Sequence, residues 1–505
     1  MKGKLLYAAI ILVISLVGLS AQDFEERWED EIPLGLKVST ELQGGGYSGT
    51  SAAFWSVHGQ GGRRSLAPTS ALLDITTSYK YQLGKGHYLT GVFEGLMESG
   101  MKPIYRLRQL GIGYKNDWVG IKLGAMDYQQ PIDFSPQTSG AMVLSNNALP
   151  IPMVLLHTND FIEIPKTNGI LSLYADFSVG RFFENRYHQL TYPGAPDRYY
   201  TVGTLWHHKT GYLRIGKEDG TLPLTLTVGG THAAQWGGHH HGLEKSEPAS
   251  FKDFFRVIMG KSGGSDATTS DQINVLGNHF GQYLMELAWH TPSHRFQLYH
   301  LHIFEDKSGI ELNNGPDGLW GLHVTFKKKS SPISHALVEY ITTMNQSGPF
   351  HILDFYRPNG EGRGGGADGY YSNGEYRSGA TYVGMNIGNP LLIPRAYKDY
   401  LEDDAKRYQH NRIQAFHFGI SGTLEQLWNI KYEAKLTLAK SWGSFYSRPE
   451  KPFHATYSYL RVQAPIEYFK GLYVGLEAGM DFGKYTPKTL GGGISLQYHF
   501  NKEHF

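Results

Sequence analysis

Two short blocks of acidic, amide and aromatic residues are the first candidates for chemistry in this sequence. FED contributes Glu305 and Asp306, and NNGPDGLW contributes Asn313, Asp317 and Trp320. Carboxylates and amides exchange hydrogen bonds with hydroxyl groups, and an indole can cover the apolar C–H face of a sugar ring. The five residues are therefore predicted to contact a sugar. The alternative is a structural loop, in which Asp and Asn turn the chain and glycines supply positive φ.

A second polar segment, at residues 357–412, has similar chemistry. Arg357 and Tyr370 are predicted to contact the same kind of ligand. Neighbouring residues of similar type are Arg363, Asp368, Tyr371 and Asn373. The structural alternative applies to these residues as well.

The two adjacent carboxylates raise the question of glycoside hydrolysis. On extended backbone, Glu305 and Asp306 point to opposite faces. Hydrolysis by two carboxylates needs both of them at one scissile bond, roughly 5 to 9.5 Å apart. The zinc-protease pattern H-E-x-x-H is absent, and GRGGGADG lacks the strand–helix setting of a phosphate loop. We expect no catalytic residues and no cofactor, with a barrel enzyme acting on glycan or lipid as the alternative.

Histidine clusters could hold a metal ion. His300 and His302 would share one face of a strand, and GGHHHG at 237–242 holds three consecutive imidazoles. Imidazoles without a placed carboxylate or an outer-shell partner are a weak signal for a metal site. We therefore predict no metal ligands.

In the segments that position these residues, apolar and polar residues alternate with a period of two. In GLYVGLEAGMDFG, an extended backbone places Glu477 and Asp481 on one face and apolar side chains on the other, among them Val474, Leu476, Met480 and Phe482. We predict that the apolar face contacts lipid and that the carboxylates face a lumen. Arginine should then cost roughly 2 to 4 kcal/mol on the lipid face and far less on the lumen face.

The same alternation recurs in LKVSTELQ, LLDITTSYKYQL, WGLHVTFK and WNIKYEAKLTLA. Roughly ten residues per segment suits a tilted strand that crosses a bilayer, whereas strands of a soluble β-sandwich average about 5 to 6 residues. Tyrosine and tryptophan at the strand ends fit interfacial girdles. The chain ends in an aromatic strand, as substrates of the barrel-assembly machinery do, with Ile494, Leu496, Tyr498 and Phe500 on one face. The pattern predicts an all-β protein, an outer-membrane antiparallel β-barrel.

We predict about 18 strands for this barrel, because bacterial single-chain barrels have an even number and around 19 segments alternate. LGKG at 83–86, KND at 115–117 and YFKG at 468–471 are predicted to be periplasmic turns. Counts from the two ends disagree on sidedness between about residues 200 and 350. A small-solute pore is another alternative function, although large loops argue against a wide pore.

The N-terminus predicts export. Lys2 and Lys4 precede an apolar run from Leu5 to Leu19 that is followed by small residues, which is the pattern of a cleaved signal peptide at 1–21. Residues 22–505 are then one transmembrane β-barrel domain in the outer membrane, with its lipid as a partner. The net charge of +1 gives no reason to expect nucleic acid, and the absence of cysteine excludes disulfides.

Four segments are too long for simple hairpins, namely 127–169, 230–279, 305–319 and 357–412. The second contains PASFKDFFRVIMG, whose apolar residues recur at helical spacing behind Ser250 as a possible N-cap. We predict a short helix there, packed against the barrel mouth.

The loops resemble a known family. TSGAMVLSNNALPIPMV, GNHFGQY, YHLHIFEDKSGIELNNGPDGLWG and YYSNGEYRSGATYVGMNIGNPLL are similar to blocks of the capsule assembly protein Wzi family, especially its versions from Bacteroidetes. The resemblance covers most of the chain, in order. It implies an outer-membrane barrel, 18-stranded in the enterobacterial member, with short periplasmic helices. It also implies a lectin-like protein that binds capsular polysaccharide and helps to assemble or retain the capsule at the cell surface.

Overall fold

The computed structural model describes most of the chain between residues 34 and 502. The described ranges are 34–100, 104–132, 134–191, 200–241, 246–328, 331–346, 369–394, 410–445, 448–484 and 486–502. The predicted signal peptide at 1–21 and the predicted ligand residue Arg357 lie outside them.

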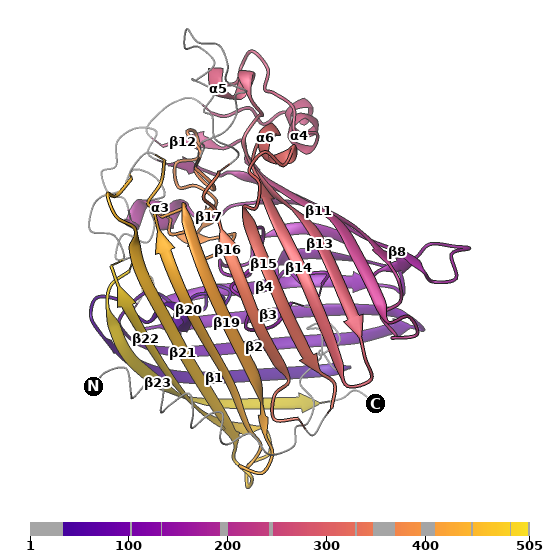
Figure 1. The fold of residues 1–505 in the computed structure, drawn as a ribbon, viewed down its shortest axis with the longest axis vertical. Helices are drawn as coiled ribbons and strands as arrows, with labels where there is room; N and C mark the ends of the chain where they lie inside the picture. The colour runs from indigo at the N-terminus through magenta and orange to yellow at the C-terminus, as the bar shows by residue number, and fades with distance from the viewer. Residues whose placement is uncertain are drawn as a thin grey trace.

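Eighteen antiparallel strands of the described residues form a barrel, which closes where the last strand pairs with the first (Figure 1). The first nine are β1 (Gly35–Ser48), β2 (Thr69–Gly84), β3 (His87–Glu98), β4 (Tyr105–Lys115), β5 (Val119–Ala125), β6 (Met153–Thr158), β8 (Leu171–Arg181), β10 (Leu205–Ile215) and β11 (Leu224–Trp236). The other nine are β13 (Asn278–His290), β14 (His294–Phe304), β15 (Gly318–Phe326), β16 (His335–Thr342), β19 (Ile413–Leu424), β20 (Ile430–Ser441), β21 (Phe453–Pro465), β22 (Leu472–Gly483) and β23 (Thr489–Lys502). A two-residue strand, β7 (Ile162–Glu163), pairs with β8 beyond the end of β6. The predicted barrel of about 18 strands is confirmed.

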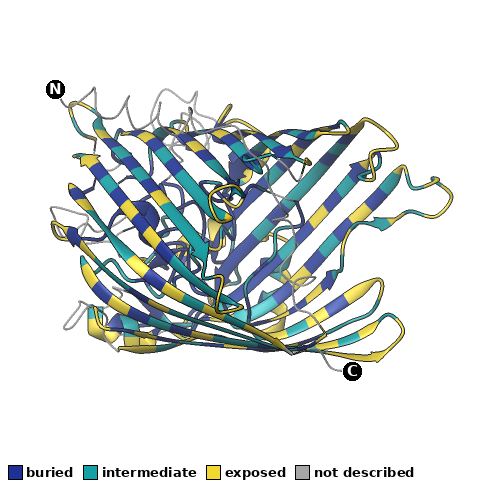
Figure 2. Cartoon of the chain, turned by 90° about the horizontal axis from the view of Figure 1, so that it is seen from below, coloured by how far each residue is buried: buried dark blue, intermediate teal, exposed yellow. Residues whose placement is uncertain are grey.

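The predicted faces of β22 are also confirmed. Leu476 and Phe482 are exposed on the outside of the barrel, whereas Glu477 and Asp481 are buried in the lumen. Figure 2 shows the same alternation along the other strands, as bands of exposed and buried residues. Exposed apolar residues on the strands β1, β2, β15, β20 and β23 include Leu42, Ile75, Leu322, Leu438 and Ile494. A continuous apolar outer surface follows, as a lipid-facing wall requires.

Aromatic side chains form a row across four neighbouring strands. His300 on β14 is the register partner of Trp320 on β15, which is the partner of Tyr340 on β16. Tyr340 in turn is opposite Phe416 on β19. This row fits the aromatic girdle that was expected at a membrane interface.

The two ends of the barrel differ. The turns between β2 and β3, β4 and β5, and β21 and β22 are short and lie at one end, as the sequence predicts. The connections 49–68, 126–152, 182–204, 237–277, 305–317 and 343–412 join strands whose ends lie at the opposite end. Because outer-membrane barrels have short periplasmic turns and longer extracellular loops, the second end is the extracellular one. With 18 strands, the counts from the two ends of the chain assign the same sidedness to the connections between residues 200 and 350.

Two predicted connections are corrected. The segment 127–169 is not one loop, since it contains β6 and β7. With six residues, β6 is shorter than the ten-residue alternation that identified other strands. The segment 230–279 is shortened because β11 continues to Trp236. The connection 49–68 was not predicted to be long.

The described helices lie in the lumen or at the extracellular end (Figure 1). They are α2 (Phe54–Val57) in the lumen, and α3 (Asn185–Thr191), α4 (Phe251–Ile258), α5 (Thr269–Ile273) and α6 (Lys307–Ile310) in the long connections. The periplasmic helices implied by the family resemblance are not found among the described residues. No helix in the described ranges is long and apolar enough to cross a membrane.

Three segments fold inward and fill the lumen, namely 49–68, 126–152 and 369–394. Their apolar residues join lumen-facing residues of the wall in one core cluster. The Phe54 ring stacks on Tyr457 of β21 with centroids 4.3 Å apart. Trp55 Nε1 donates to Thr437 Oγ1 of β20 at 2.8 Å. We call these three segments the plug.

A glycine on the lumen face of β22, Gly479, admits the plug. A Cβ atom on Gly479 would lie 2.4 Å from the Cβ of Ala53, which is too close for any larger residue. Two residues further along β22, the Asp481 carboxylate accepts a 2.7 Å hydrogen bond from the Phe54 backbone N–H. Small residues and carboxylates alternate there because the wall both touches the plug and anchors it.

The predicted helix at the barrel mouth is confirmed as α4. Ser250 caps it, and the Asp253 side chain accepts from the Ser250 backbone N–H at 3.0 Å, which completes a capping box. Phe254 packs on the outer wall against Trp236 of β11, with ring centroids 5.8 Å apart. Phe251 and Phe255 remain exposed on the helix.

Candidate functional site

The acidic residues of the 305–317 connection hold the loops of the extracellular end together. The Glu305 carboxylate accepts a hydrogen bond from the Tyr371 backbone N–H in the plug. Asp306 is the N-cap of α6, because its side chain accepts from the Gly309 backbone N–H at 3.1 Å. It also accepts from the Ser308 hydroxyl at 2.7 Å. Both carboxylates therefore have structural partners.

Asp317 is the centre of a buried network. Its carboxylate accepts three backbone N–H hydrogen bonds, from Met344 at 2.9 Å, Asn345 at 2.9 Å and Gln346 at 2.7 Å. The Tyr370 hydroxyl donates to the same carboxylate at 3.0 Å. Burial raises the pKa of the Asp317 carboxyl to about 6. Asp317 and Tyr370 are fully buried, so they tie the 305–317 loop to residues 344–346 and to Tyr370 of the 343–412 connection.

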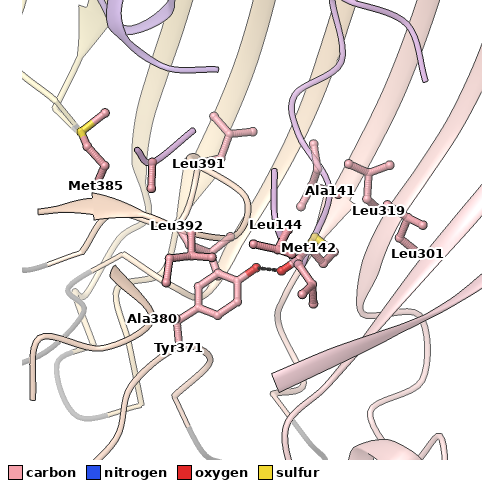
Figure 3. Packing of buried hydrophobic residues seen from close by; sticks show 14 of the residues in the cluster. Ala141, Met142, Leu144, Leu301, Leu319, Tyr371, Ala380, Met385, Leu391 and Leu392 are labelled. Atoms are coloured by element: carbon pink, nitrogen blue, oxygen red, sulfur yellow. Dashed lines mark hydrogen bonds between the residues drawn. The ribbon is translucent and has the colours of Figure 1, made fainter. Parts of the chain in front are cut away.

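The neighbouring Tyr371 extends this network into the lumen. Its hydroxyl donates to the Met142 carbonyl at 2.6 Å, in a pocket of apolar side chains that includes Leu144 and Leu391 (Figure 3). Asn389 Nδ2 donates to a second carbonyl of the same plug segment, that of Gly140, at 2.6 Å. The plug and the extracellular loops thus form one connected body.

Asn313 and Trp320 are the predicted ligand residues with exposed side chains in the described part of the chain. Asn313 is exposed in a turn of the 305–317 connection. Trp320 points outward from β15 near the extracellular rim and is 38% exposed. Its indole stacks on His300 with ring centroids 3.8 Å apart, and its Nε1 donates to the Pro316 carbonyl at 3.2 Å. These contacts fix the indole at the rim.

Trp320 therefore belongs to the aromatic row of the wall as well as to the predicted ligand residues. The structure brings Glu305, Asp317 and Tyr370 into one loop frame, in which Asp317 and Tyr370 are buried and Glu305 is half-buried, and it leaves Asn313 and Trp320 outside this frame. Contact of any of them with a sugar stays a prediction.

A cavity in the lumen was missed by the sequence-based prediction. It has a volume of about 290 Å³ and lies beside the 49–68 segment, with a lining that includes Trp55, Arg63, Asp74, Lys435 and Arg461. Two of its arginines are paired, since Arg63 Nε lies 2.8 Å from Glu94 and Arg461 lies 2.9 Å from Glu41. Charged lumen faces of β2 and β20 were visible in the sequence, but their convergence on Trp55 depends on how the plug folds.

One group of side chains in the described ranges could hold a metal ion. His240, Glu247 and Glu375 present ligand atoms that all lie within 4.8 Å of one another. His300 and His302, which were considered from the sequence, are not part of such a group among the described residues. The histidine block at 237–242 was also considered from the sequence, but no metal ligands were predicted, and Glu247 and Glu375 were not singled out.

The fold defines the class of protein. A closed barrel with an apolar outer wall, an even number of antiparallel strands and short turns at one end is an outer-membrane β-barrel. The family model for capsule assembly protein Wzi matches residues 121–400, which is more than half of the chain. The chain belongs to the capsule assembly protein Wzi family.

Several solved structures are similar to this chain. Wzi from Escherichia coli, described as a carbohydrate-binding β-barrel involved in group 1 capsule assembly, has 12% identity and a TM-score of 0.56, with 92% of this chain and 85% of that chain covered. OccK5 (OpdH) from Pseudomonas aeruginosa has 9% identity and a TM-score of 0.46, with 92% and 97% covered. OccAB4 from Acinetobacter baumannii has 9% identity and a TM-score of 0.45, with 93% and 98% covered. A comparison with curated proteins found no match.

Proposed function

We propose that this protein binds capsular or other surface polysaccharide and helps to assemble or retain the capsule at the cell surface. Membership of the capsule assembly family is the observation that carries this proposal. The fold that the chain shares with the carbohydrate-binding Wzi barrel of Escherichia coli supports it. The filled lumen supports it further, because a plugged barrel offers its extracellular loops, rather than a channel, to a polymer.

The glycan contacts are proposed at the solvent-facing part of the 305–320 region. Asn313 offers an amide to sugar hydroxyls, and Trp320 offers an indole at the rim. Glu305, Asp306, Asp317 and Tyr370 are proposed to support these contacts by holding the loop frame described above. Arg357 remains a proposed contact from the sequence.

The protein is proposed to act without catalysis. Glu305 and Asp306 are adjacent, yet one binds the Tyr371 backbone and the other caps α6. They therefore do not face one scissile bond, as a pair of hydrolytic carboxylates must. We further propose that residues 1–21 are a cleaved signal peptide and that the barrel-assembly machinery inserts the chain into outer-membrane lipid.

The test is direct binding of purified, detergent-solubilised protein to immobilised capsular polysaccharide and to short oligosaccharide fragments of it. Fragments are needed because many weak contacts along one polymer can hide the loss of a single contact. We expect the Asn313→Ala, Trp320→Ala double variant to bind fragments roughly tenfold more weakly, since a hydrogen bond contributes about 0.5 to 1.5 kcal/mol and stacking adds to it.

Trp289→Ala is the matched control. Trp289 is also an exposed tryptophan of the outer wall, but it lies at the periplasmic end of β13. Its loss should leave fragment affinity unchanged. Absence of binding by the wild-type protein would reject the proposed function, and release of shortened glycan chains would identify an enzyme instead. Equal losses in the two variants would reject the proposed contacts alone.

A further inference from the structure

Three extracellular connections meet at His240. The two-residue strand β12 (His239–His240) pairs with β9 (Thr201–Val202), which places His240 opposite Thr201. Glu247 follows in the same connection as His240, and Glu375 comes from the 369–394 segment of the plug. Figure 1 shows β12 above the barrel at the extracellular end. The meeting point is therefore outside the membrane-spanning wall.

Hydrogen bonds to backbone carbonyls hold this meeting point in place. The Glu247 N–H donates to the Gly238 carbonyl at 2.9 Å, and the Tyr376 hydroxyl donates to the Gly237 carbonyl at 3.0 Å. The Thr201 hydroxyl donates to the Glu375 carbonyl at 2.9 Å. The three side chains that converge here are thus held by a prearranged backbone.

The carboxylate of Glu247 is only half satisfied. One oxygen, Oε1, lies 2.5 Å from His240 Nε2, while the other, Oε2, is buried and has no hydrogen-bond partner. The side chain is fully buried. A buried anionic oxygen without a partner is unfavourable by several kcal/mol in general, so a positively charged ligand at this oxygen would be stabilising.

We propose that His240, Glu247 and Glu375 bind a divalent cation of the first transition series, with Zn²⁺ as the best fit. One imidazole and two carboxylates are a ligand set that such cations accept. His240 Nε2 and Glu375 Oε2 are 3.4 Å apart, and two ligands of a tetrahedral zinc ion at about 2.0 Å are separated by about 3.3 Å. Thr201 Oγ1, 3.4 Å from His240 Nδ1, is placed to orient the ring from behind.

A proton is the competitor for this site. Hydrogen bonds to Glu247 and Glu375 raise the pKa of His240 to about 9, so an imidazolium can take the place of a cation. The imidazolium leaves Glu247 Oε2 without a partner and leaves the group with a net negative charge. A divalent cation satisfies the oxygen and neutralises both carboxylates. The cation would link three extracellular connections, and this inference does not rest on the proposed function.

The test is zinc binding by the full-length protein without a polyhistidine tag. The protein is stripped with a chelator, dialysed against Zn²⁺, and analysed for bound metal and by calorimetry. We expect one Zn²⁺ per chain, and at least tenfold weaker binding in each of His240→Gln, Glu247→Gln and Glu375→Gln. Ca²⁺ should bind more weakly than Zn²⁺ because it prefers oxygen ligands in larger number.

His239→Gln is the matched control in the same histidine run. His239 Nδ1 contacts the Ser246 hydroxyl at 3.1 Å and is not part of the group. Zinc binding should survive this change. Failure of the wild-type protein to bind zinc would overturn the proposal, and so would an equal loss in His239→Gln and His240→Gln, which would show adventitious binding by the histidine run.

Folding of each variant is checked by heat-modifiable gel mobility. Glu375→Gln keeps the test decisive if the more buried variants fail to fold, because Glu375 is partly exposed. Hydrogen exchange gives an independent readout in the wild-type protein. Zinc should slow exchange at residues 237–241 and 371–380 together, and no change in either segment would contradict the proposal.

Discussion

Arg64 in the plug and Glu477 on β22 form a buried ion pair, with Nη1 2.5 Å from Oε1, although they are 413 positions apart in the sequence. The hydroxyls of Tyr47 and Tyr459 donate to the same carboxylate at 3.0 and 3.1 Å. The lumen face of β22 is therefore an anchor for the plug. Arginine at position 477 would meet Arg64 and should be far more harmful than the alternation alone suggests.

Loss of one partner of this pair should destabilise the plug. In Arg64→Ala, Glu477 stays buried without its cation, and breaking a buried pair in this way costs about 3 to 5 kcal/mol. The double variant Arg64→Met, Glu477→Gln should recover part of this loss, because no unpaired charge remains. Denaturant titration of hydrogen exchange in residues 52–64 measures both effects. Unchanged exchange in Arg64→Ala would show that the pair does not anchor the plug.

The plug predicts that the barrel does not conduct. Segments 49–68, 126–152 and 369–394 fill the lumen with apolar residues of one core cluster. In a planar bilayer, wild-type protein should show no steady ion current. Replacement of residues 52–64 by a glycine–serine linker should increase the current, because α2 and its contacts are lost. Steady conductance of the wild-type protein would support the pore alternative.

A neighbouring pair on β23 gives a cleaner test of lipid and lumen faces than positions 476 and 477. Leu496 is exposed on the outer wall, and Gln497 lines the lumen cavity. Leu496→Arg should lower the free energy of unfolding in lipid vesicles by roughly 2 to 4 kcal/mol, whereas Gln497→Arg should have a much smaller effect. Equal losses for the two variants would reject the assigned faces.

Glu184 should make the extracellular end dependent on pH. Its buried carboxylate accepts from the Val383 backbone N–H at 2.9 Å in the turn between the two-residue strands β17 (Thr381–Tyr382) and β18 (Met385–Asn386). Burial raises the pKa of Glu184 from 4.5 to about 8. The nearby His188, 3.7 Å away, is neutral because burial lowers its pKa to about 3.

The direction of the pH effect follows from the number of protons that the folded and unfolded states bind. Between pH 4.5 and about 8 the folded state keeps the Glu184 proton and the unfolded state does not, so stability falls as pH rises across this window. Glu184→Gln removes the ionisable group and should raise the thermal unfolding midpoint at pH 8.5 but hardly change it at pH 4. An equal or lower midpoint at pH 8.5 would contradict this assignment.

The turn at Val383 and Gly384 was not identified from the sequence. Val383 and Gly384 both have positive φ, of 48° and 80°, as a two-residue hairpin turn of the primed type requires. A Cβ on Gly384 would lie 2.1 Å from the Tyr187 hydroxyl of α3. Glycine is needed there for its conformation and for this close contact.

Strand faces and strand number could be predicted because a period of two is local information. The alternation of apolar and polar residues around Leu476 and Glu477 can be recognised within a few residues, and the structure confirms the two faces that it predicts. The plug could not be predicted, because the contact between Ala53 and Gly479 joins segments more than 400 residues apart. The run AAFWSV was the one available signal, as an apolar cluster inside a loop rich in glycine and serine.

The ambiguity of the site residues has a chemical cause. A carboxylate such as Asp317 binds a sugar hydroxyl or a backbone N–H equally well, and the choice depends on where residues 344–346 lie. Likewise, the sequence does not show that His240 lies beside Glu375, because this proximity depends on how the loops fold. The signal peptide, Arg357 and the Bacteroidetes origin suggested by the loop blocks stay predictions.

Capsule attachment in living cells tests the central claim most directly. An encapsulated strain lacking this protein is complemented with the wild-type gene or with the Asn313→Ala, Trp320→Ala variant, after normal folding of both barrels is shown by gel mobility. Surface-bound and released polysaccharide are then measured. Our account predicts that cells without the protein release polymer into the medium while total polymer stays normal, that the wild-type gene restores attachment, and that the variant restores it only partly. Full attachment in the absence of the protein would contradict it.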